Sequence, residues 1–108
     1  TRHCEACRAD SPRATEQERD TLLQEIPDWK LEPEDGVDRL SRVFKFADFQ
    51  KAFEFTARVA ALAEQEDHHP AILLEWGKVT VQWWTHKIKG LHTNDFIMAA
   101  KTDRLISQ

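Results

Sequence analysis

Apolar and polar residues recur along the chain in patterns that predict a helix, a hairpin, a helix, a hairpin and a helix. Thr15-Glu16-Gln17-Glu18 has the form of a capping box, which predicts a first helix from there to about Glu25. Asp48 is a suitable N-cap for the longest helix, expected from Phe49 to about Asp67, where apolar residues recur every three or four positions. A last helix is expected to begin at Thr93 or Asn94.

Between these helices, alternation of apolar and polar residues predicts four strands. Turn residues after the first and third strands indicate two hairpins. Val43 interrupts the alternation of the second strand and indicates a bulge or a twist there. The expected strands are Trp29–Glu32, Val37–Phe46, Ala71–Trp76 and a segment from Val79 to about Thr85.

This order predicts an α+β fold, a two-layer sandwich in which a four-stranded antiparallel sheet made of two hairpins carries helices on one face. Residues 15–108 are expected to form a single domain, preceded by a flexible N-terminal tail, residues 1–14. A sheet this small leaves an open edge strand, and an open edge can pair with another copy. A homo-oligomer is therefore expected.

Composition narrows the classes of function. The 108 residues are 41% hydrophobic and 31% charged, which is typical of globular proteins, and no apolar run is long enough to cross a bilayer. The net charge of −4 gives no general attraction to phosphate backbones, so direct binding of nucleic acid is not expected. The polar N-terminal segment lacks the apolar core of a secretory signal, which favours a cytoplasmic protein.

The tail contains a CxxC pair, Cys4-Glu5-Ala6-Cys7, preceded by His3. Such a pair can form half of a zinc site or a redox dithiol. The chain has no second cysteine pair, and no predicted strand precedes this one. We therefore expect two reduced thiols in a mobile tail, with metal capture between subunits as the alternative.

Two adjacent histidines end the longest predicted helix. Glu64 and His68 are four residues apart, so their side chains are expected to share a helix face and the carboxylate to orient the imidazole. The helix C-terminus should favour a protonated His68, which suits a general acid. The alternative is that His68 only caps the helix. His69 precedes Pro70 and is expected to be extended.

A third histidine, His86, follows Trp83-Trp84 at the end of the last predicted strand. This topology could bring His86 to the same end of the sheet as His68 and His69, where the tryptophans would suit a flat heteroaromatic ligand. Three histidines also raise the possibility of a metal site. Adjacent histidines before a proline rarely converge on one ion, so no metal is expected.

The spacing of these residues resembles a family signature. The order and spacing are similar to the motif of the pterin-4a-carbinolamine dehydratases, also called 4a-hydroxytetrahydrobiopterin dehydratases. They are Glu64, three residues, His68-His69-Pro70, five residues, Trp76, nine residues, His86, eight residues and Asp95. The resemblance extends over roughly Leu22 to Arg104, and the cysteine-containing tail is similar to bacterial members. Further matching segments are Ile26-Pro27-Asp28-Trp29, Phe44-Lys45-Phe46 and Gly90-Leu91.

The resemblance implies an enzyme that dehydrates the 4a-carbinolamine of a tetrahydropterin to the quinonoid dihydropterin, recycling the cofactor of aromatic amino acid hydroxylases. It implies no cofactor and no metal, since the pterin is the substrate. His68, His69 and His86 would line the pterin pocket, with His68 and His86 transferring protons and His69 binding the ring. The pocket would be completed by Glu64, Pro70, Trp76 and Asp95. Glu64 would support His68, and Trp76 would form a wall of the pocket. Asp95 would be either an acid of the site or a helix cap.

The resemblance also implies assembly into a homodimer or a homotetramer. Some animal relatives act in addition as dimerisation cofactors of a transcription factor. The alternative to the enzyme is therefore a non-catalytic dimerisation or coactivator module on the same fold, in which the histidines have no chemical task.

Overall fold

The computed structural model describes residues 15–107, and it confirms the predicted α+β fold. The order of elements is the expected one, with bounds that differ from the predicted ones by a few residues. Two short 3-10 helices, His86–Ile88 and Leu105–Ser107, follow the last strand and the last helix. The elements are α1 Glu16–Leu23, β1 Lys30–Glu34, β2 Val37–Lys45, α2 Phe49–Glu66, β3 Ala71–Glu75, β4 Lys78–Trp83 and α3 Thr93–Arg104.

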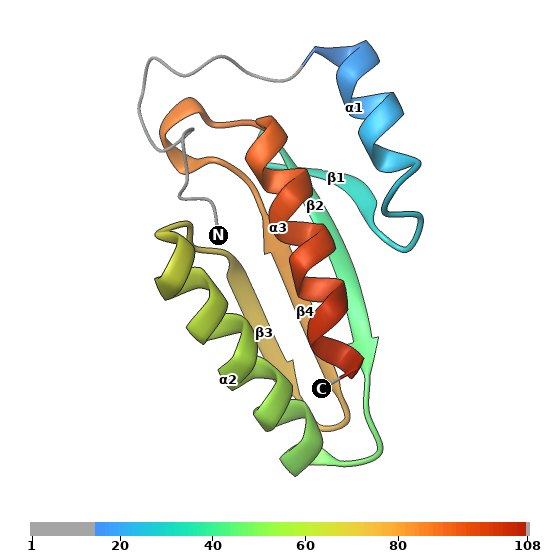
Figure 1. Ribbon diagram of the computed structural model, residues 1–108, viewed down its shortest axis with the longest axis vertical. Helices are drawn as coiled ribbons and strands as arrows, with labels where there is room; N and C mark the ends of the chain where they lie inside the picture. The colour runs from blue at the N-terminus through green and yellow to red at the C-terminus, as the bar shows by residue number, and fades with distance from the viewer. Residues whose placement is uncertain (1–14, 108) are drawn as a thin grey trace.

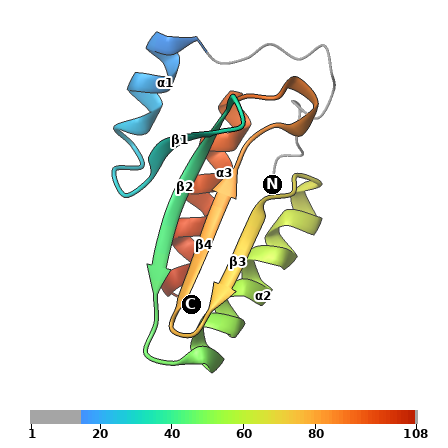
Figure 2. The same ribbon diagram turned by 180° about the vertical axis from the view of Figure 1, so that it is seen from behind.

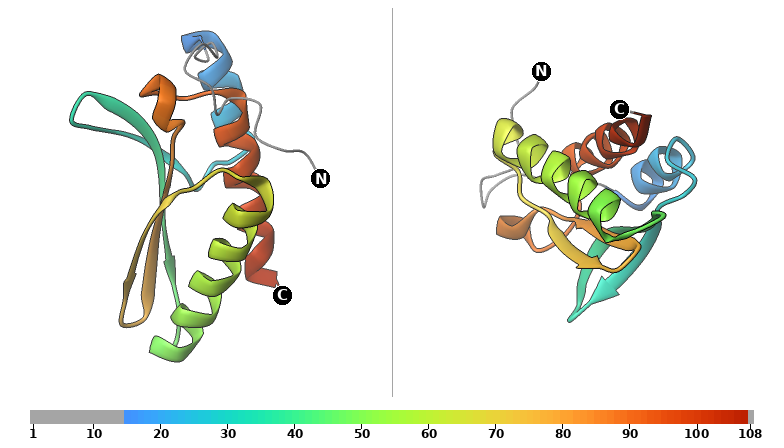
Figure 3. Two further views of the ribbon diagram at one scale, coloured as in Figure 1. Left: turned by 90° about the vertical axis from the view of Figure 1, so that its left-hand side faces the viewer. Right: turned by 90° about the horizontal axis from the view of Figure 1, so that it is seen from below.

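The four strands form one antiparallel sheet in the order β1-β2-β4-β3. The two hairpins are therefore joined through β2 and β4, and β1 and β3 are the edges. All three helices lie on one face of the sheet, which leaves the other face open (Figures 1 and 3). Seen from the open face, β3 and β4 run side by side, with α2 and α3 behind the sheet (Figure 2).

The predicted caps begin the helices. The Thr15 hydroxyl oxygen accepts from the Glu18 N–H at 3.1 Å and the Glu18 carboxylate accepts from the Thr15 N–H at 2.8 Å, which confirms the capping box. The backbone and then the side-chain hydrogen bond to Thr15 lower the pKa of Glu18 below its usual value. Asp48 caps α2 by accepting from the Lys51 N–H at 2.8 Å.

The end of α2 sets the direction of the chain into the third strand. The helix stops at Glu66, and Asp67 adopts a left-handed conformation with φ of 53°. The N–H of His68 then closes the helix by donating to the carbonyl of Ala63 at 3.1 Å. As predicted, the helix ends before Pro70, and it does so through a left-handed residue three positions earlier.

The bulge that was one expectation at Val43 is absent. The pairing of β2 with β4 is continuous from Leu40 opposite Trp83 to Lys45 opposite Lys78, so no residue is inserted. Val43 lies opposite Thr80 and is exposed on the open face of the sheet. An apolar residue on the half-solvated face of the sheet therefore broke the alternation without an inserted residue.

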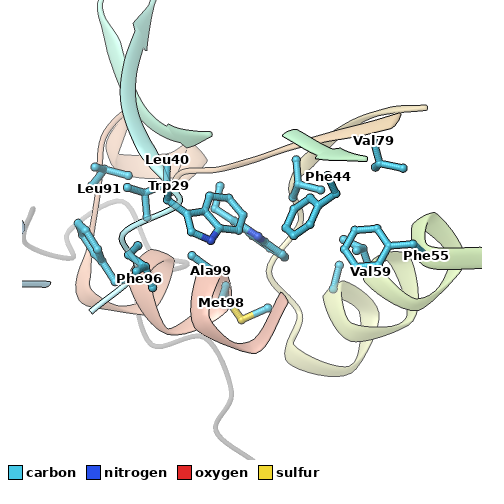
Figure 4. Close-up of a cluster of buried hydrophobic side chains, with 14 of the residues drawn as sticks. Trp29, Leu40, Phe44, Phe55, Val59, Val79, Leu91, Phe96, Met98 and Ala99 are labelled. Carbon is cyan, nitrogen blue, oxygen red and sulfur yellow. The ribbon is translucent and has the colours of Figure 1, made fainter. Parts of the chain in front are cut away.

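The core lies between the sheet and the helices (Figure 4). The rings of Phe44 on β2 and Phe55 on α2 have centroids 4.6 Å apart, and Val59, Val79, Val81 and Trp83 are fully buried beside them. Polar contacts close its edge, since Asp103 on α3 accepts from Trp29 Nε1 at 2.8 Å and from Arg42 at 2.6 Å.

Two predictions about the whole chain have different outcomes. The flexible tail with Cys4 and Cys7 lies outside the described residues, so it stays a prediction. Within residues 15–107, no helix combines the length and the apolar character needed to cross a bilayer.

Phe55→Ala should lower the free energy of unfolding by about 3–5 kcal/mol, because it removes a buried ring from the contact between helix and sheet. Phe53→Ala on the same helix is the matched control, since Phe53 is 50% exposed against 1% for Phe55, and should cost no more than about 1 kcal/mol. Urea denaturation followed by tryptophan fluorescence measures both. Equal losses would contradict the burial of Phe55.

Candidate active site

The structure brings the three predicted histidines together at one end of the sheet, where β3 begins and β4 ends. His68 and His69 link α2 to β3, and His86 opens the 3-10 helix after β4. Between the two segments lies a cavity of about 270 Å³, lined by Asp67, His68, His69, Thr85, His86 and Lys87. Three imidazoles therefore border a single cavity.

His68 is held by a buried carboxylate. Its Nε2 lies 2.6 Å from Oδ1 of Asp95, and both side chains are almost completely removed from solvent. Oδ2 of Asp95 accepts from the Thr85 hydroxyl at 2.8 Å and from the His92 N–H at 2.9 Å. When Asp95 is ionised its oxygens only accept, so Nε2 of His68 donates the hydrogen. The carboxylate thus fixes both the position and the tautomer of this imidazole.

Asp95 holds this place because it is also the cap of α3. His92 is the N-cap residue, its Nδ1 accepts from the Asn94 N–H at 3.2 Å, and Asp95 stands three residues after it. The sequence left open whether Asp95 is a cap or a residue of the site. It caps the helix, and the same carboxylate binds His68, although Asp95 itself does not line the cavity.

The predicted pairing of Glu64 with His68 is wrong. Glu64 Oε2 lies 2.5 Å from Nε2 of His69, on the exposed rim. The four-residue spacing holds only within a continuous helix, and the left-handed Asp67 turns His68 away from Glu64 and towards α3. Each of the adjacent histidines consequently has its own carboxylate, one buried and one exposed.

His86 is oriented by a stack of rings on the open face. Its imidazole lies over Trp84, with centroids 4.3 Å apart and planes at 23°, and the Arg39 guanidinium lies 3.9 Å from the centre of the Trp84 ring. The His86 Nε2 donates to the backbone carbonyl of His69 at 3.0 Å. Because a carbonyl only accepts, a neutral His86 has Nδ1 as its proton-accepting nitrogen.

Trp76 and Pro70, like Glu64 and Asp95, are not among the residues that line the cavity. Trp76 lies in the turn between β3 and β4, at the opposite end of β3 from His69, and it is 73% exposed. The expectation that it forms a wall of the pocket is therefore wrong within one chain. Pro70 follows His69 directly but is not among the residues that line the cavity.

Comparison with known proteins decides the family. Residues 12–105 match the model of the family described as Pterin 4 alpha carbinolamine dehydratase. The chain belongs to this family. A Marinobacter nauticus protein that is named, provisionally, a pterin-4-alpha-carbinolamine dehydratase is 62% identical over 102 residues, which span 94% of this chain and 92% of that protein.

Two solved structures are similar to this pterin dehydratase fold. One, from Brucella melitensis, is described as a transcriptional coactivator/pterin dehydratase; it has a TM-score of 0.79 and 36% identity, and the match covers 87% of this chain and 98% of that one. The other is described as a pterin dehydratase-like protein and a RuBisCO assembly factor in the alpha-carboxysome. At 22% identity and a TM-score of 0.61, over 72% of this chain and 88% of that one, it shows likeness of fold alone.

The structure adds Thr85 and Lys87, which the sequence reasoning missed, to the site. Thr85 is buried and donates to Asp95, while Trp83, one of the two expected tryptophans, stacks on His68 with centroids 5.6 Å apart. Lys87 supplies a cation to the cavity lining. Thr85 continues the alternation of Val81 and Trp83, so its inward direction could have been predicted, whereas its carboxylate partner could not.

Metal binding has no further support in the described part of the chain. Among residues 15–107, no group of three or more histidine, cysteine, aspartate or glutamate side chains is arranged to hold a metal ion. The alternative that Cys4, Cys7 and His3 capture a metal between subunits concerns residues outside this range and stays a prediction.

Asp95→Ala should lower the free energy of unfolding by about 3 kcal/mol, because it leaves buried donors on His68 and Thr85 unpaired and removes a helix cap. Glu64→Ala removes the carboxylate of the other histidine pair, and should cost no more than about 1 kcal/mol because that pair is exposed. Chemical denaturation of the two variants and the wild type measures the difference. A larger cost for Glu64→Ala would contradict this ranking of the two pairs.

Proposed function

We propose that the protein dehydrates 4a-hydroxytetrahydropterins to quinonoid dihydropterins, with its histidines as acid and base. Membership of the pterin dehydratase family supports the reaction. The observation that carries the proposal is the cavity bordered by three imidazoles, two of which are each paired with a carboxylate of their own. Recycling of the pterin for aromatic amino acid hydroxylases is the metabolic role that follows, and the cytoplasm stays the predicted location.

The reaction requires two proton transfers and no change in the oxidation state of the protein. The C4a hydroxyl takes up a proton and leaves as water, while the lone pair of N5 forms the double bond to C4a. The proton on N5 is then released, so the pterin loses one water molecule in total. Side chains that titrate near neutrality are suited to both transfers.

We assign one transfer to His68. A buried carboxylate beside an imidazole holds the ring in position and in one tautomer, as in other aspartate–histidine pairs of enzymes. Asp95 is fixed in turn by Thr85 and His92, so the imidazole is held from two elements of the fold. Asp95 is therefore a positioning residue in this mechanism.

We assign the second transfer to His86, which lines the same cavity as His68. Its Nε2 is engaged by the carbonyl of His69, so Nδ1 is the atom that exchanges the proton. Stacking on Trp84 restricts rotation of the ring. His69, paired with Glu64 at the rim, is left to bind and orient the pterin.

His68→Ala and His86→Ala should each lower kcat by about 100-fold or more, the usual contribution of a general acid or base. The measurement is a stopped assay on freshly generated 4a-hydroxytetrahydropterin. His92→Ser is the matched control: it removes an imidazole that does not line the cavity and keeps a capping side chain at the start of α3.

The control should keep the wild-type rate. A wild type that does not accelerate the reaction over buffer would overturn the proposed function. A folded His68→Ala or His86→Ala variant with full kcat would remove the proton-transfer role from that residue alone.

A chelator should leave the rate unchanged, because imidazoles deliver and remove the two protons without a Lewis acid. The measurement is the same assay after dialysis against EDTA, with total metal determined in the sample. A loss of rate that added zinc restores would favour the metal alternative instead.

A non-catalytic dimerisation or coactivator module is the second candidate function. The Brucella melitensis structure, described as both a coactivator and a pterin dehydratase, is the observation that favours it. The assay separates the two functions, since a pure scaffold would not accelerate dehydration. Assembly as a homodimer or homotetramer is compatible with both, and is proposed here for this chain.

A further inference from the structure

Glu66 is a buried carboxylate that the proposed mechanism does not use. It is the last residue of α2 and is 1% exposed. Among residues 15–107 its one charged partner is Lys101 on α3, whose Nζ lies 3.4 Å from Oε1, and no group is placed to donate a hydrogen bond to either carboxylate oxygen. A carboxylate that is buried with so few partners is costly, so its presence calls for an explanation.

Packing alone does not explain a charge at this position. The buried residues of α2 recur every three or four positions, and Glu66 ends the series. The four before it are apolar: Ala52, Phe55, Val59 and Ala63. A leucine would continue this stripe without the cost of burying a charge, so the reason lies in what the carboxylate contacts.

The partner of Glu66 lies on the helix that also holds Asp95. α2 and α3 run in opposite directions (Figure 1). Glu66, before the left-handed turn, therefore contacts the later residue Lys101, whereas His68, after that turn, contacts the earlier residue Asp95. These two partners are six residues apart, about 9 Å along the axis of α3. The end of α2 and the turn after it are thus attached to α3 at two separated points.

The two attachments have opposite polarity. The carboxylate is on α3 in the contact of His68 with Asp95, and on α2 in the contact of Glu66 with Lys101. If the end of α2 moved along α3 towards its start, the carboxylates of Glu66 and Asp95 would approach each other, and two like charges repel strongly where water is excluded. The charge pattern therefore favours one register between the two helices.

We propose that Glu66 and Lys101 are positioning residues for His68. Their ion pair holds the end of α2 in the register against α3 in which the turn at Asp67 delivers the imidazole to Asp95. Neither residue of the ion pair lines the cavity, so both act through His68. The effect on catalysis rests on the proposed function, whereas the effect on the geometry of the imidazole does not.

An ion pair in this role is expected to act on stability and on geometry in opposite directions. Replacing a buried ion pair by apolar side chains of similar volume is often neutral or stabilising, because the cost of burying the charges disappears. Apolar side chains also fill the space without specifying which residues lie opposite each other. A protein without the ion pair should therefore be at least as stable as the wild type, but should hold His68 less well.

The test is the double variant Glu66→Leu/Lys101→Leu. Its urea midpoint should equal or exceed that of the wild type, whereas kcat in the dehydratase assay should fall about 10-fold, since small displacements of a reacting group lower the rate steeply. KM should not change, because both side chains lie outside the cavity lining. A merely structural role would not separate kcat from stability in this way.

Two further variants are controls. Lys101→Arg keeps the cation and should keep the wild-type kcat. Arg19→Leu/Asp38→Leu removes a different ion pair, which joins α1 to β2 with 2.6 Å between the charged atoms and does not line the cavity. This second control should leave kcat unchanged.

The geometry of His68 is measured without substrate, by proton NMR of the ring N–H that donates to Asp95. In the wild type this hydrogen is buried in a short contact with a carboxylate, so we expect a signal at low field that exchanges slowly with water. His68→Gln identifies the signal by removing it. The signal should be weakened or absent in the double variant of the Glu66 pair, and retained in the control that removes the other ion pair.

A double variant with full kcat and an unchanged signal would overturn the proposal. A fall of kcat that is matched by a lower urea midpoint would overturn it as well, because the ion pair would then be merely structural. If the wild type has no dehydratase activity, the proposed function fails, and the NMR signal alone decides whether Glu66 and Lys101 position His68.

Discussion

The carboxylate of Asp95 is the contact on which the candidate site depends. It lies at the start of α3, and it binds the imidazole that follows α2 and the hydroxyl that follows β4. Three segments that are distant in the sequence therefore meet at one buried group. Because an unpaired charge in this position would be costly, the fold keeps the carboxylate and its donors together. The geometry of His68 is thus a property of the core and not of a surface loop.

The adjacent histidines differ because the chain turns between α2 and β3. The left-handed Asp67 sends His68 into the protein and leaves His69 at the rim with Glu64. His68 and its carboxylate are buried, whereas the exposed pair of His69 and Glu64 is screened by solvent. One dipeptide thereby supplies two environments, which is a sound basis for dividing proton transfer and binding between them.

Local signals explain what the sequence could predict. The caps at Thr15 and Asp48 and the alternation in the strands depend on neighbouring residues, so the elements and their order followed from the sequence. The pairing of Glu64 with His68 failed because helical spacing holds only up to the residue where the helix ends. The true partner of His68 is 27 residues further along the chain, and no local pattern identifies a contact of that kind.

Trp76 shows the same limit at the level of assembly. His69 and Trp76 lie at opposite ends of β3, so a single chain cannot place both at one cavity. Their spacing along the sequence groups Trp76 with the histidines, but the extended strand between them holds them apart in the fold.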